Sequence, residues 1–433
     1  MFETLKNAFK VKEIRTKIFI TLGFVLLYRV GCYIPVPGIS ASGFSSVIDG
    51  NDFLGIMSAI SGGSLSSGTL FAMGISPYIN ASIIMQLLSI AIPALERLSK
   101  QGDEGRKKIA QYTRYLTLVL GIIQIVAILI STGESGMDFN AFGTSAKWMT
   151  YILTSIIFMS GVALTMWIGE RITEYGIGNG MSLLIFVGIM CTAGVAIAGQ
   201  IEAIFGGDLS ALWALLGFFV VCIVIFGCIV TIDLSVRNIP VQYAKQVKGR
   251  KMYGGQSSVI PIKVNGSGVL PLIFAFAILS MPQLVASLFW PNSTFAIWWA
   301  TYLGSGTYIY SLLLAVLIVF FAYFYAMIQF NPEDVARNIQ ANGGFIQGIR
   351  PGKPTSDYLS KISNRITLFG AMYLAMVALI PSLLFTAIAG TSGIGLINAF
   401  STTGLLIVVS VALEFNKQID AQLMMRHYKG FLK

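Results

Sequence analysis

The chain has little charge and few of the side chains on which catalytic and metal sites most often depend. Charged residues make up 11% of its 433 positions, hydrophobic residues make up 55%, and His427 is the single histidine. Its cysteines are Cys32, Cys191, Cys222 and Cys228, which lie in apolar segments without a paired spacing such as CxxC. These shortages predict a protein with no disulfide framework, no metal site, no other cofactor and no histidine-based catalysis.

Acidic side chains are missing from the apolar segments, and no nucleotide-binding motif is complete. Without HExxH or an intramembrane carboxylate, an intramembrane protease would lack its catalytic groups. Residues 176–180, Gly-Ile-Gly-Asn-Gly, link two apolar segments instead of following a strand. Gly352-Lys353 precedes Pro354, where a phosphate loop requires Ser or Thr. We therefore expect no enzyme activity.

Ten long apolar segments dominate the rest of the sequence. Crossing a hydrocarbon core takes about 20 helical residues, and backbone amides in lipid must be hydrogen-bonded within their own segment. Segments this long therefore predict an all-α polytopic membrane protein. The ten segments lie at residues 18–34, 70–93, 115–131, 148–168, 181–199, 211–232, 267–290, 308–330, 366–389 and 394–413.

The distribution of basic residues predicts the orientation of these segments. All but two of the 29 Lys and Arg residues fall in alternate loops on one side, and the exceptions are Arg29, inside the first segment, and Lys147. Basic loops stay in the cytosol. We therefore expect both termini to be cytosolic.

Ten spans divide into two groups of five, which must enter the bilayer from opposite sides. This count predicts an inverted repeat, with an N-terminal half at 1–199, an external connecting loop at 200–210 and a C-terminal half at 211–433. Such halves commonly leave a path between them, which favours a channel or a transporter. The missing intramembrane carboxylates disfavour a proton-coupled carrier, but a secondary transporter of small solutes remains an alternative.

Three segments between the spans are more apolar or longer than a simple connecting loop. Residues 53–60 are apolar, but a helix of this length reaches only about 12 Å, so it either re-enters the membrane or lies on the outer interface. Two large cytosolic loops, 233–263 and 331–365, include strand-like residues at 259–264 and a predicted helix that starts after Asn331 and stops at Asn342-Gly343. Such loops predict docking surfaces, although their cations can also be purely topological.

Several motifs resemble those of the SecY family, and they occur in order along the chain. The resemblance implies a protein-conducting channel of the bacterial cytoplasmic membrane. Such a channel translocates unfolded secretory polypeptides and releases hydrophobic segments laterally into the bilayer. The motifs are Ser61-Gly-Gly-Ser64, the run from Gly74 to Leu88, Gln111-Tyr-Thr-Arg-Tyr115, Gly176-Ile-Gly-Asn-Gly180, Lys263-Val-Asn265 and Gly348-Ile-Arg-Pro-Gly352.

The resemblance also implies site residues around an hourglass pore. Aliphatic side chains would close its waist, where they dewet a narrow constriction, and a short plug helix would cover it from outside. The implied ring is Ile75, Ile79, Met181, Ile185, Ile273 and Ile407. Ile75 and Ile79 are four residues apart, as are Met181 and Ile185, so each pair shares one helix face, and Met181 is the one member without a branched side chain. The implied plug includes Phe53, Leu54, Ile56, Met57 and Ile60, with a hinge at Gly62 and Gly63. The implied lateral gate is lined by Asn80, Gln124 and Asn265.

A channel without a nucleotide site needs partners that supply the work. The resemblance implies the SecA ATPase or a translating ribosome, docked on the cytosolic loops, with SecE and SecG as accessory subunits. Signal peptides and nascent secretory or membrane proteins would be the clients. A ribosome scaffold without conduction is a further alternative. The implied docking residues are Lys245, Lys248, Arg250, Lys251, Arg350 and Lys353.

Overall fold

The structure is a computed structural model, and it divides into two compact units. Met1–Phe218, Ser280–Thr307 and Phe385–Lys433 form the first unit, and Phe219–Leu279 with Tyr308–Leu384 form the second. The residues that it describes are 6, 8–49, 54, 57–58, 61–99, 101–133, 136–139, 141, 147–207, 209–243, 246–248, 251–253, 257–266, 268, 270–289, 293–303, 307–389 and 402–430.

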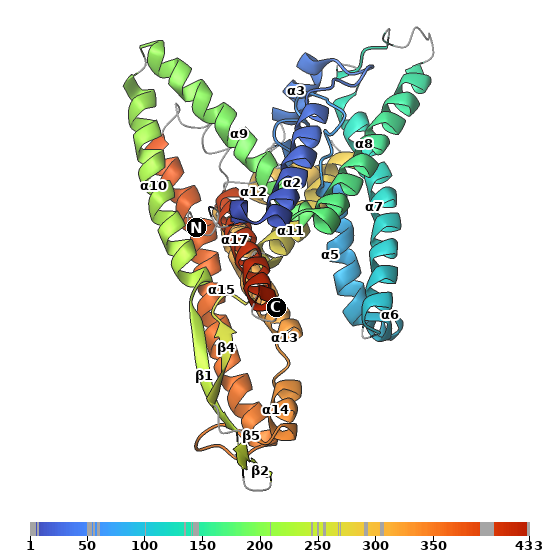
Figure 1. The fold of residues 1–433 in the computed structure, drawn as a ribbon. Helices are drawn as coiled ribbons and strands as arrows, with labels where there is room; N and C mark the ends of the chain where they lie inside the picture. Colours follow the sequence, from blue (N-terminus) through green and yellow to red (C-terminus); the bar gives the residue numbers. More distant parts are fainter. Residues whose placement is uncertain are drawn as a thin grey trace. The chain divides into compact units, whose positions relative to one another are not determined.

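Helices make up most of the first unit (Figure 1). α7 packs between α5 and α8, and α8 also contacts α2 and α9, so these helices form one continuous bundle. α9 in turn packs against α17, the last helix of the chain. The bounds are α2 (Lys12–Gly31), α3 (Ala41–Asp49), α5 (Ser76–Ala91), α6 (Pro93–Ser99), α7 (Asp103–Thr132), α8 (Lys147–Tyr175), α9 (Gly180–Phe205), α12 (Thr294–Leu303) and α17 (Thr402–Gly430).

A proline separates α5 from α6. The residue before a proline is biased away from the helical region, and Ile92 is extended, with φ −105° and ψ 113°. The two helices consequently meet at a bend of 105°. The chain then turns back through Gly102 into α7.

The first unit has an apolar core on the side of α3, α7 and α8. Phe44 of α3 is fully buried, and the centre of its ring lies 6.4 Å from the centre of the Phe158 ring of α8. Ile125 and Leu129 of α7 complete this core. Leu54 and Met57, from the segment predicted to be the plug, belong to the same core, so these two residues are packed inside the unit.

The second unit combines helices with a small antiparallel sheet in the order β4-β1-β5 (Figure 1). In the hairpin of β1 and β4, Ile239 lies opposite Ile260, and β5 extends the sheet by pairing with the end of β1. The strands are β1 (Val236–Tyr243), β2 (Gln246–Lys248), β3 (Lys251–Tyr253), β4 (Ser257–Lys263) and β5 (Gly344–Phe345). The helices that lie wholly or mainly in this unit are α10 (Leu209–Asp233), α13 (Tyr308–Gln329), α14 (Pro332–Ala341) and α15 (Lys353–Ala389). The first half of α11 (Leu270–Phe289) also belongs to it, up to Leu279.

The sequence correctly predicted the ends of α14. The Asn331 side chain accepts a hydrogen bond from the Glu333 N–H at 3.1 Å, and Pro332 occupies the first helical position. The helix stops at Asn342, and Gly343 has a φ of +68°, which favours glycine. The predicted strand at 259–264 is also confirmed, as β4.

Each of the ten predicted apolar segments contains a helix. Within the described residues, six helices are long and apolar enough to cross a membrane, or seven if the bent pair of α5 and α6 counts as one span. The start of the last predicted segment, 394–413, lies outside the described residues. The structure is therefore mostly helical as expected, while the count of ten spans stays a prediction.

Candidate functional site

The predicted ring residues lie at buried or half-buried positions. Ile75 directly precedes α5, and the Ile79 N–H donates to its carbonyl at 3.0 Å, so both side chains project from the same face. Ile273 lies on α11 in the second unit. Exposed fractions are 4% for Ile75, 8% for Met181, 6% for Ile185 and 7% for Ile407. No polar or charged side chain is among these six residues, so they offer a passing peptide no hydrogen bonds.

The start of α9 is fixed by its own cap. The Asn179 side chain accepts hydrogen bonds from the backbone N–H groups of Met181, at 3.0 Å, and Ser182, at 3.5 Å. Two of the four unpaired N–H groups at the helix start are thereby satisfied. Because Met181 and Ile185 lie in the first two turns of α9, this cap sets the position of both predicted ring residues. α9 packs on α17, which carries Ile407.

Met181 is held against α8. A Cβ atom placed on Gly169 would overlap the Met181 sulfur, and a Cβ atom on Gly180 would overlap the Gly169 carbonyl. α8 and α9 therefore approach each other closely, which only glycine permits. Sequence reasoning identified Met181 as the ring member without a branched side chain, but it missed Gly169.

The described part of the predicted plug is folded back on itself. The Ser61 N–H donates to the Met57 carbonyl at 3.0 Å, and the Gly63 N–H donates to the Ser58 carbonyl at 2.8 Å. Gly62 and Gly63 have φ angles of +75° and +80°, a region that favours glycine. This is the hydrogen-bond pattern of a helix that ends at a glycine. Phe53, Ile56 and Ile60 lie outside the described residues.

The predicted lateral-gate residues lie in both units. In the first unit, Asn80 is half-buried on α5, and Gln124 is buried on α7, the helix that packs against α5. The Gln124 Oε1 atom has no hydrogen-bond partner among the described residues. In the second unit, Asn265 is buried, and its Nδ2 donates to Asp233 Oδ1 at 3.0 Å. Sequence reasoning missed Asp233.

The register of the hairpin explains the contact between Asp233 and Asn265. Val236 lies opposite Lys263, and the Val264 N–H donates to the Ser235 carbonyl at 3.1 Å. The hairpin therefore returns the chain to the end of α10. Asn265 of the Lys-Val-Asn motif thus lies beside a carboxylate 32 residues earlier in the sequence.

The two large loops predicted to be cytosolic, 233–263 and 331–365, form one structured body. The hairpin, α14, β5 and the start of α15 share an apolar core, made of Ile239, Val241, Ile262, Ile339, Ile346 and Leu359. Sequence reasoning treated the loops separately and missed β1 and β5. The alternation of Ile239, Val241 and Tyr243 with polar residues and proline was a usable signal for β1.

Two of the six predicted docking residues are exposed on this body. Arg350 borders a cavity of about 550 Å³ that extends along residues 343–351, and Lys353 begins α15. The Thr355 hydroxyl donates to the Arg350 carbonyl at 2.8 Å and thus fixes the backbone there. Lys245 and Arg250 lie outside the described residues, and Lys248 and Lys251 are placed only by their backbone, opposite each other in β2 and β3.

A protein-family model matches most of the chain. It is the model of the SecY family, and the match covers residues 69–416. This chain belongs to the SecY family. The resemblance that the sequence motifs indicated is thereby confirmed.

Relatives in the SecY family match along the full length. The protein translocase subunit SecY of Streptomyces griseus is 43% identical over 449 residues, which cover 100% of both chains. The protein translocase subunit SecY of Thermotoga maritima is 40% identical over 440 residues, which cover 100% of this chain and 98% of that protein.

Solved structures of channel subunits share the fold. A structure described as a protein conducting channel has a TM-score of 0.66 at 20% identity, over 94% of this chain and 91% of that one. Sec61 in the canine ribosome-channel complex from the endoplasmic reticulum has a TM-score of 0.60 at 18% identity, with the same coverage.

The SecY motif at 176–180 joins three parts of the first unit. The Ile177 N–H donates to the Thr21 hydroxyl of α2 at 3.1 Å, and the Gly180 N–H donates to the Thr173 hydroxyl of α8 at 2.8 Å. Ile177 itself is fully buried in a cluster that includes Ile14, Ile18 and Ile419. The glycines of this motif thus lie at a packed junction of α2, α8 and α17, which sequence reasoning did not foresee.

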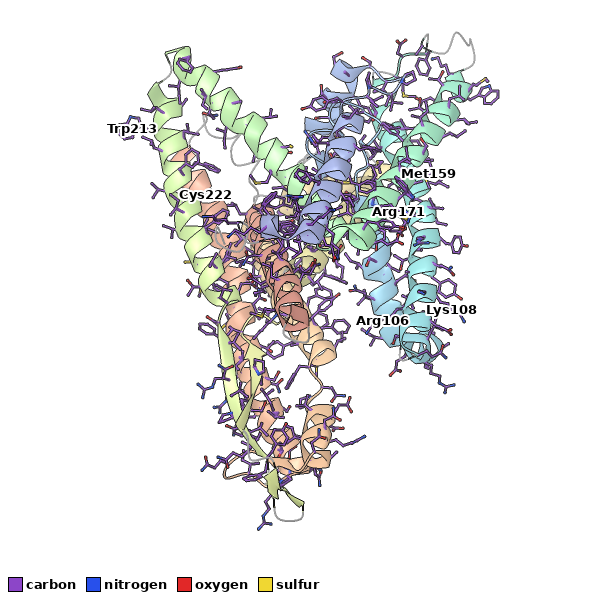
Figure 2. All side chains as sticks on the ribbon, in the orientation of Figure 1. Arg106, Lys108, Met159, Arg171, Trp213 and Cys222 are labelled. Carbon is purple, nitrogen blue, oxygen red and sulfur yellow. The ribbon has the colours of Figure 1, made fainter. Side chains whose placement is uncertain are left out.

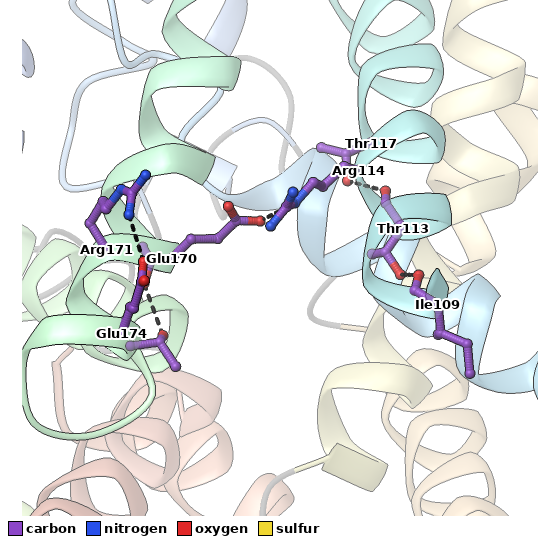
Figure 3. A network of polar contacts seen from close by, with 9 residues as sticks. Ile109, Thr113, Arg114, Thr117, Glu170, Arg171 and Glu174 are labelled. Atoms are coloured by element: carbon purple, nitrogen blue, oxygen red, sulfur yellow. Dashed lines mark hydrogen bonds and ion pairs between the residues drawn. The ribbon is translucent and has the colours of Figure 1, made fainter. Parts of the chain in front are cut away.

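A further polar contact in the first unit links α7 with α8. Arg114 of the Gln-Tyr-Thr-Arg-Tyr motif donates from Nε to Glu170 Oε1 at 2.6 Å (Figure 3). Because the two side chains are 46% and 31% exposed, the ion pair contributes about 0–1 kcal/mol. The basic residues Arg106 and Lys108 remain exposed at the α6 end of α7 (Figure 2).

No group of three or more His, Cys, Asp or Glu that could hold a metal occurs in the described part of the chain.

Proposed function

We propose that this protein is the pore subunit of a protein-conducting channel in the bacterial cytoplasmic membrane. It translocates unfolded secretory polypeptides and releases hydrophobic segments sideways into the bilayer. The observation that carries this conclusion is the match to protein translocase subunits SecY over the full chain, at 43% identity. The chain acts as a channel subunit and not as an enzyme.

The proposed architecture has ten spans in two inverted halves, 1–199 and 211–433, joined by an external loop at 200–210. α9 ends at Phe205 and α10 begins at Leu209, which supports a short connection there. Both termini lie in the cytosol, because the basic loops are retained on that side.

The proposed pore is closed at its waist by the six aliphatic ring residues. Four of the six are buried in the structure, and all six lack hydrogen-bonding side chains. A narrow constriction of this kind excludes water and ions, yet flexible aliphatic side chains can deform around an extended peptide. The plug, residues 53–67, adds a second closure from the outside and moves at Gly62 and Gly63.

The proposed lateral gate lies between α5 and α7 on one side and α11 and α13 on the other. Its polar residues, Asn80, Gln124 and Asn265, would hold the seam closed through hydrogen bonds of about 0.6 to 2 kcal/mol each. Gln124 Oε1 and Asn265 Oδ1 lack partners among the described residues and are therefore available for such bonds.

The proposed docking platform for the SecA ATPase and for ribosomes is the body formed by the hairpin, α14 and β5. Arg350 and Lys353 are exposed there and suit carboxylates or RNA phosphates. Sec61 and the yeast Ssh1 complex, which share this fold, have been solved bound to ribosomes. SecE and SecG complete the proposed complex as accessory subunits.

The ring provides the test of this function. Replacing Ile79 and Ile185 by glycine should raise the ion conductance of the purified complex in planar bilayers, because the constriction loses the side chains that exclude water. Ile90→Gly and Ile201→Gly, at exposed positions on the same two helices, are the matched controls and should leave conductance unchanged. Unchanged leak in the ring variant, together with uptake of a small solute, would favour the secondary transporter instead.

A further inference from the structure

Arg29 is a charged residue within an apolar span, and neither topology nor the proposed pore accounts for it. It lies in the last turn of α2 and is half-buried. Its Nη1 atom is buried and makes no hydrogen bond to any described residue. A charge at membrane depth costs free energy unless it faces a partner inside the protein. Arg29 therefore requires a structural explanation.

One partner of Arg29 is an aromatic ring. Its guanidinium carbon lies 5.5 Å from the centre of the Tyr33 ring, within the range of a cation–π interaction. This contact occupies one side of the guanidinium and leaves the buried Nη1 atom unexplained.

The second neighbour of Arg29 is the end of the plug. A Cβ atom on Gly62 would lie 2.6 Å from Arg29 Nη1, and 3.2 Å from the carbonyl oxygen of Gly188 on α9. The backbone at Gly62 thus lies between α2 and α9, and these two neighbours leave no space for a side chain. Its φ of +75° excludes most other residues for an independent reason.

The polarity of this contact is favourable. The hydrogen bonds from the Ser61 N–H to Met57 and from the Gly63 N–H to Ser58 close a turn with the pattern of a helix C-terminus at Gly62. The carbonyl end of a helix carries a partial negative charge, and a cation beside it is stabilising, most of all where water is scarce. Arg29 supplies that cation from another element of the first unit.

We propose that Arg29 is a positioning residue that holds the plug in its closed place through its close approach to the backbone of Gly62, where its positive charge faces the carbonyl end of the turn closed by Ser61 and Gly63. This inference rests on the proposed function, because it gives the plug the role of a seal. Loss of the charge weakens the closed state without touching the ring. Arg29 is therefore a determinant of how readily the channel opens.

The inference can be tested by measuring how accessible a buried position of the plug is to a thiol reagent. Leu54 is buried, so Leu54→Cys in a background whose four native cysteines are serine reports movement of the plug through its reaction with a membrane-impermeant maleimide. In the intact complex, Arg29→Gln should raise the reaction rate about five- to tenfold, the size expected for a cation at a partly buried helix end. Arg29→Lys, which keeps the charge, should restore much of the protection.

Two controls make the outcome decisive. Arg15→Gln removes the same charge from an exposed position on α2 and should have no effect. Ile168→Cys, fully buried on α8, reports general loosening. An Arg29→Gln rate equal to wild type, or an equal rise at Ile168→Cys, would overturn the inference.

A second variant covers poor insertion of Arg29→Gln. Gly62→Ala keeps every charge and places a Cβ atom against Arg29, whereas Gly63→Ala brings a similar strain of positive φ with nothing within 4 Å of its Cβ atom. Gly62→Ala should therefore expose Leu54→Cys more than Gly63→Ala does, and this excess should shrink in the Arg29→Gln background, since both changes act on one contact. An excess of unchanged size without Arg29 would overturn the inference. Leak through the Ile79 and Ile185 variant reports on the proposed function separately.

Discussion

At the scale of single residues, the types of the site residues could be predicted, but their contacts could not. The spacing of four between Ile75 and Ile79 predicted a shared face, and the bond between their backbones agrees with it. The contact of Met181 with Gly169 depends on how closely two helices approach, which no local pattern records. The role of each residue in the ring, the plug and the gate stays a prediction.

A prediction at this scale concerns the cap of α9. Asn179→Ala should lower the thermal stability of the purified complex by about 1 kcal/mol, because two N–H groups at the helix start lose their acceptor. Thermal unfolding followed by circular dichroism measures the effect. Asn179→Ser, which keeps a capping oxygen, should stay near wild type, and equal stability of the alanine variant would show that the cap is not needed.

At the scale of elements, short-range signals were reliable where they were strong. Asn331, Pro332 and Gly343 predicted both ends of α14, because capping depends on a few neighbouring residues. β5 consists of Gly344 and Phe345 alone, and it forms only because β1 offers an edge about one hundred residues earlier. Pairing over such a distance leaves no local trace in the sequence.

The docking platform gives a prediction at this scale. Arg350→Glu should reduce SecA-driven translocation into membrane vesicles to background while the protein remains inserted, because the reversed charge repels an acidic partner surface. Arg106→Glu, the same change at an exposed position of α7 outside the platform, is the matched control. Normal translocation by the Arg350 variant would remove this residue from the platform, and equal loss in both variants would point to net charge instead.

At the scale of the whole molecule, composition alone predicted a helical membrane protein, and the fold shared with channel subunits agrees. Counting spans predicted two inverted halves, which is a statement about orientation in the bilayer. The compact units follow contacts instead, and they divide the chain differently, at Phe218 and Phe385 among other places. The inverted halves therefore stay a prediction.

Orientation can be tested with reporter fusions. Green fluorescent protein fused after Lys433 should fluoresce, and alkaline phosphatase there should be inactive, because both reporters would remain in the cytosol. Phosphatase inserted after Gly207, in the external loop, should be active. An active phosphatase at the C-terminus would reverse the proposed topology.

The junction at Ile177 bears on how the protein is made. Its cluster includes Ile14 and Ile18 from α2 and Ile419 from α17, the last helix. Synthesis runs from the N-terminus, so α2 is made before α17. The cluster around Ile177 therefore stays incomplete until α17 has been synthesised. A chain that stalls before Ile419 would leave Ile14, Ile18 and Ile177 without part of their apolar cover. Quality-control proteases could recognise this exposed cluster, which is buried in the complete subunit.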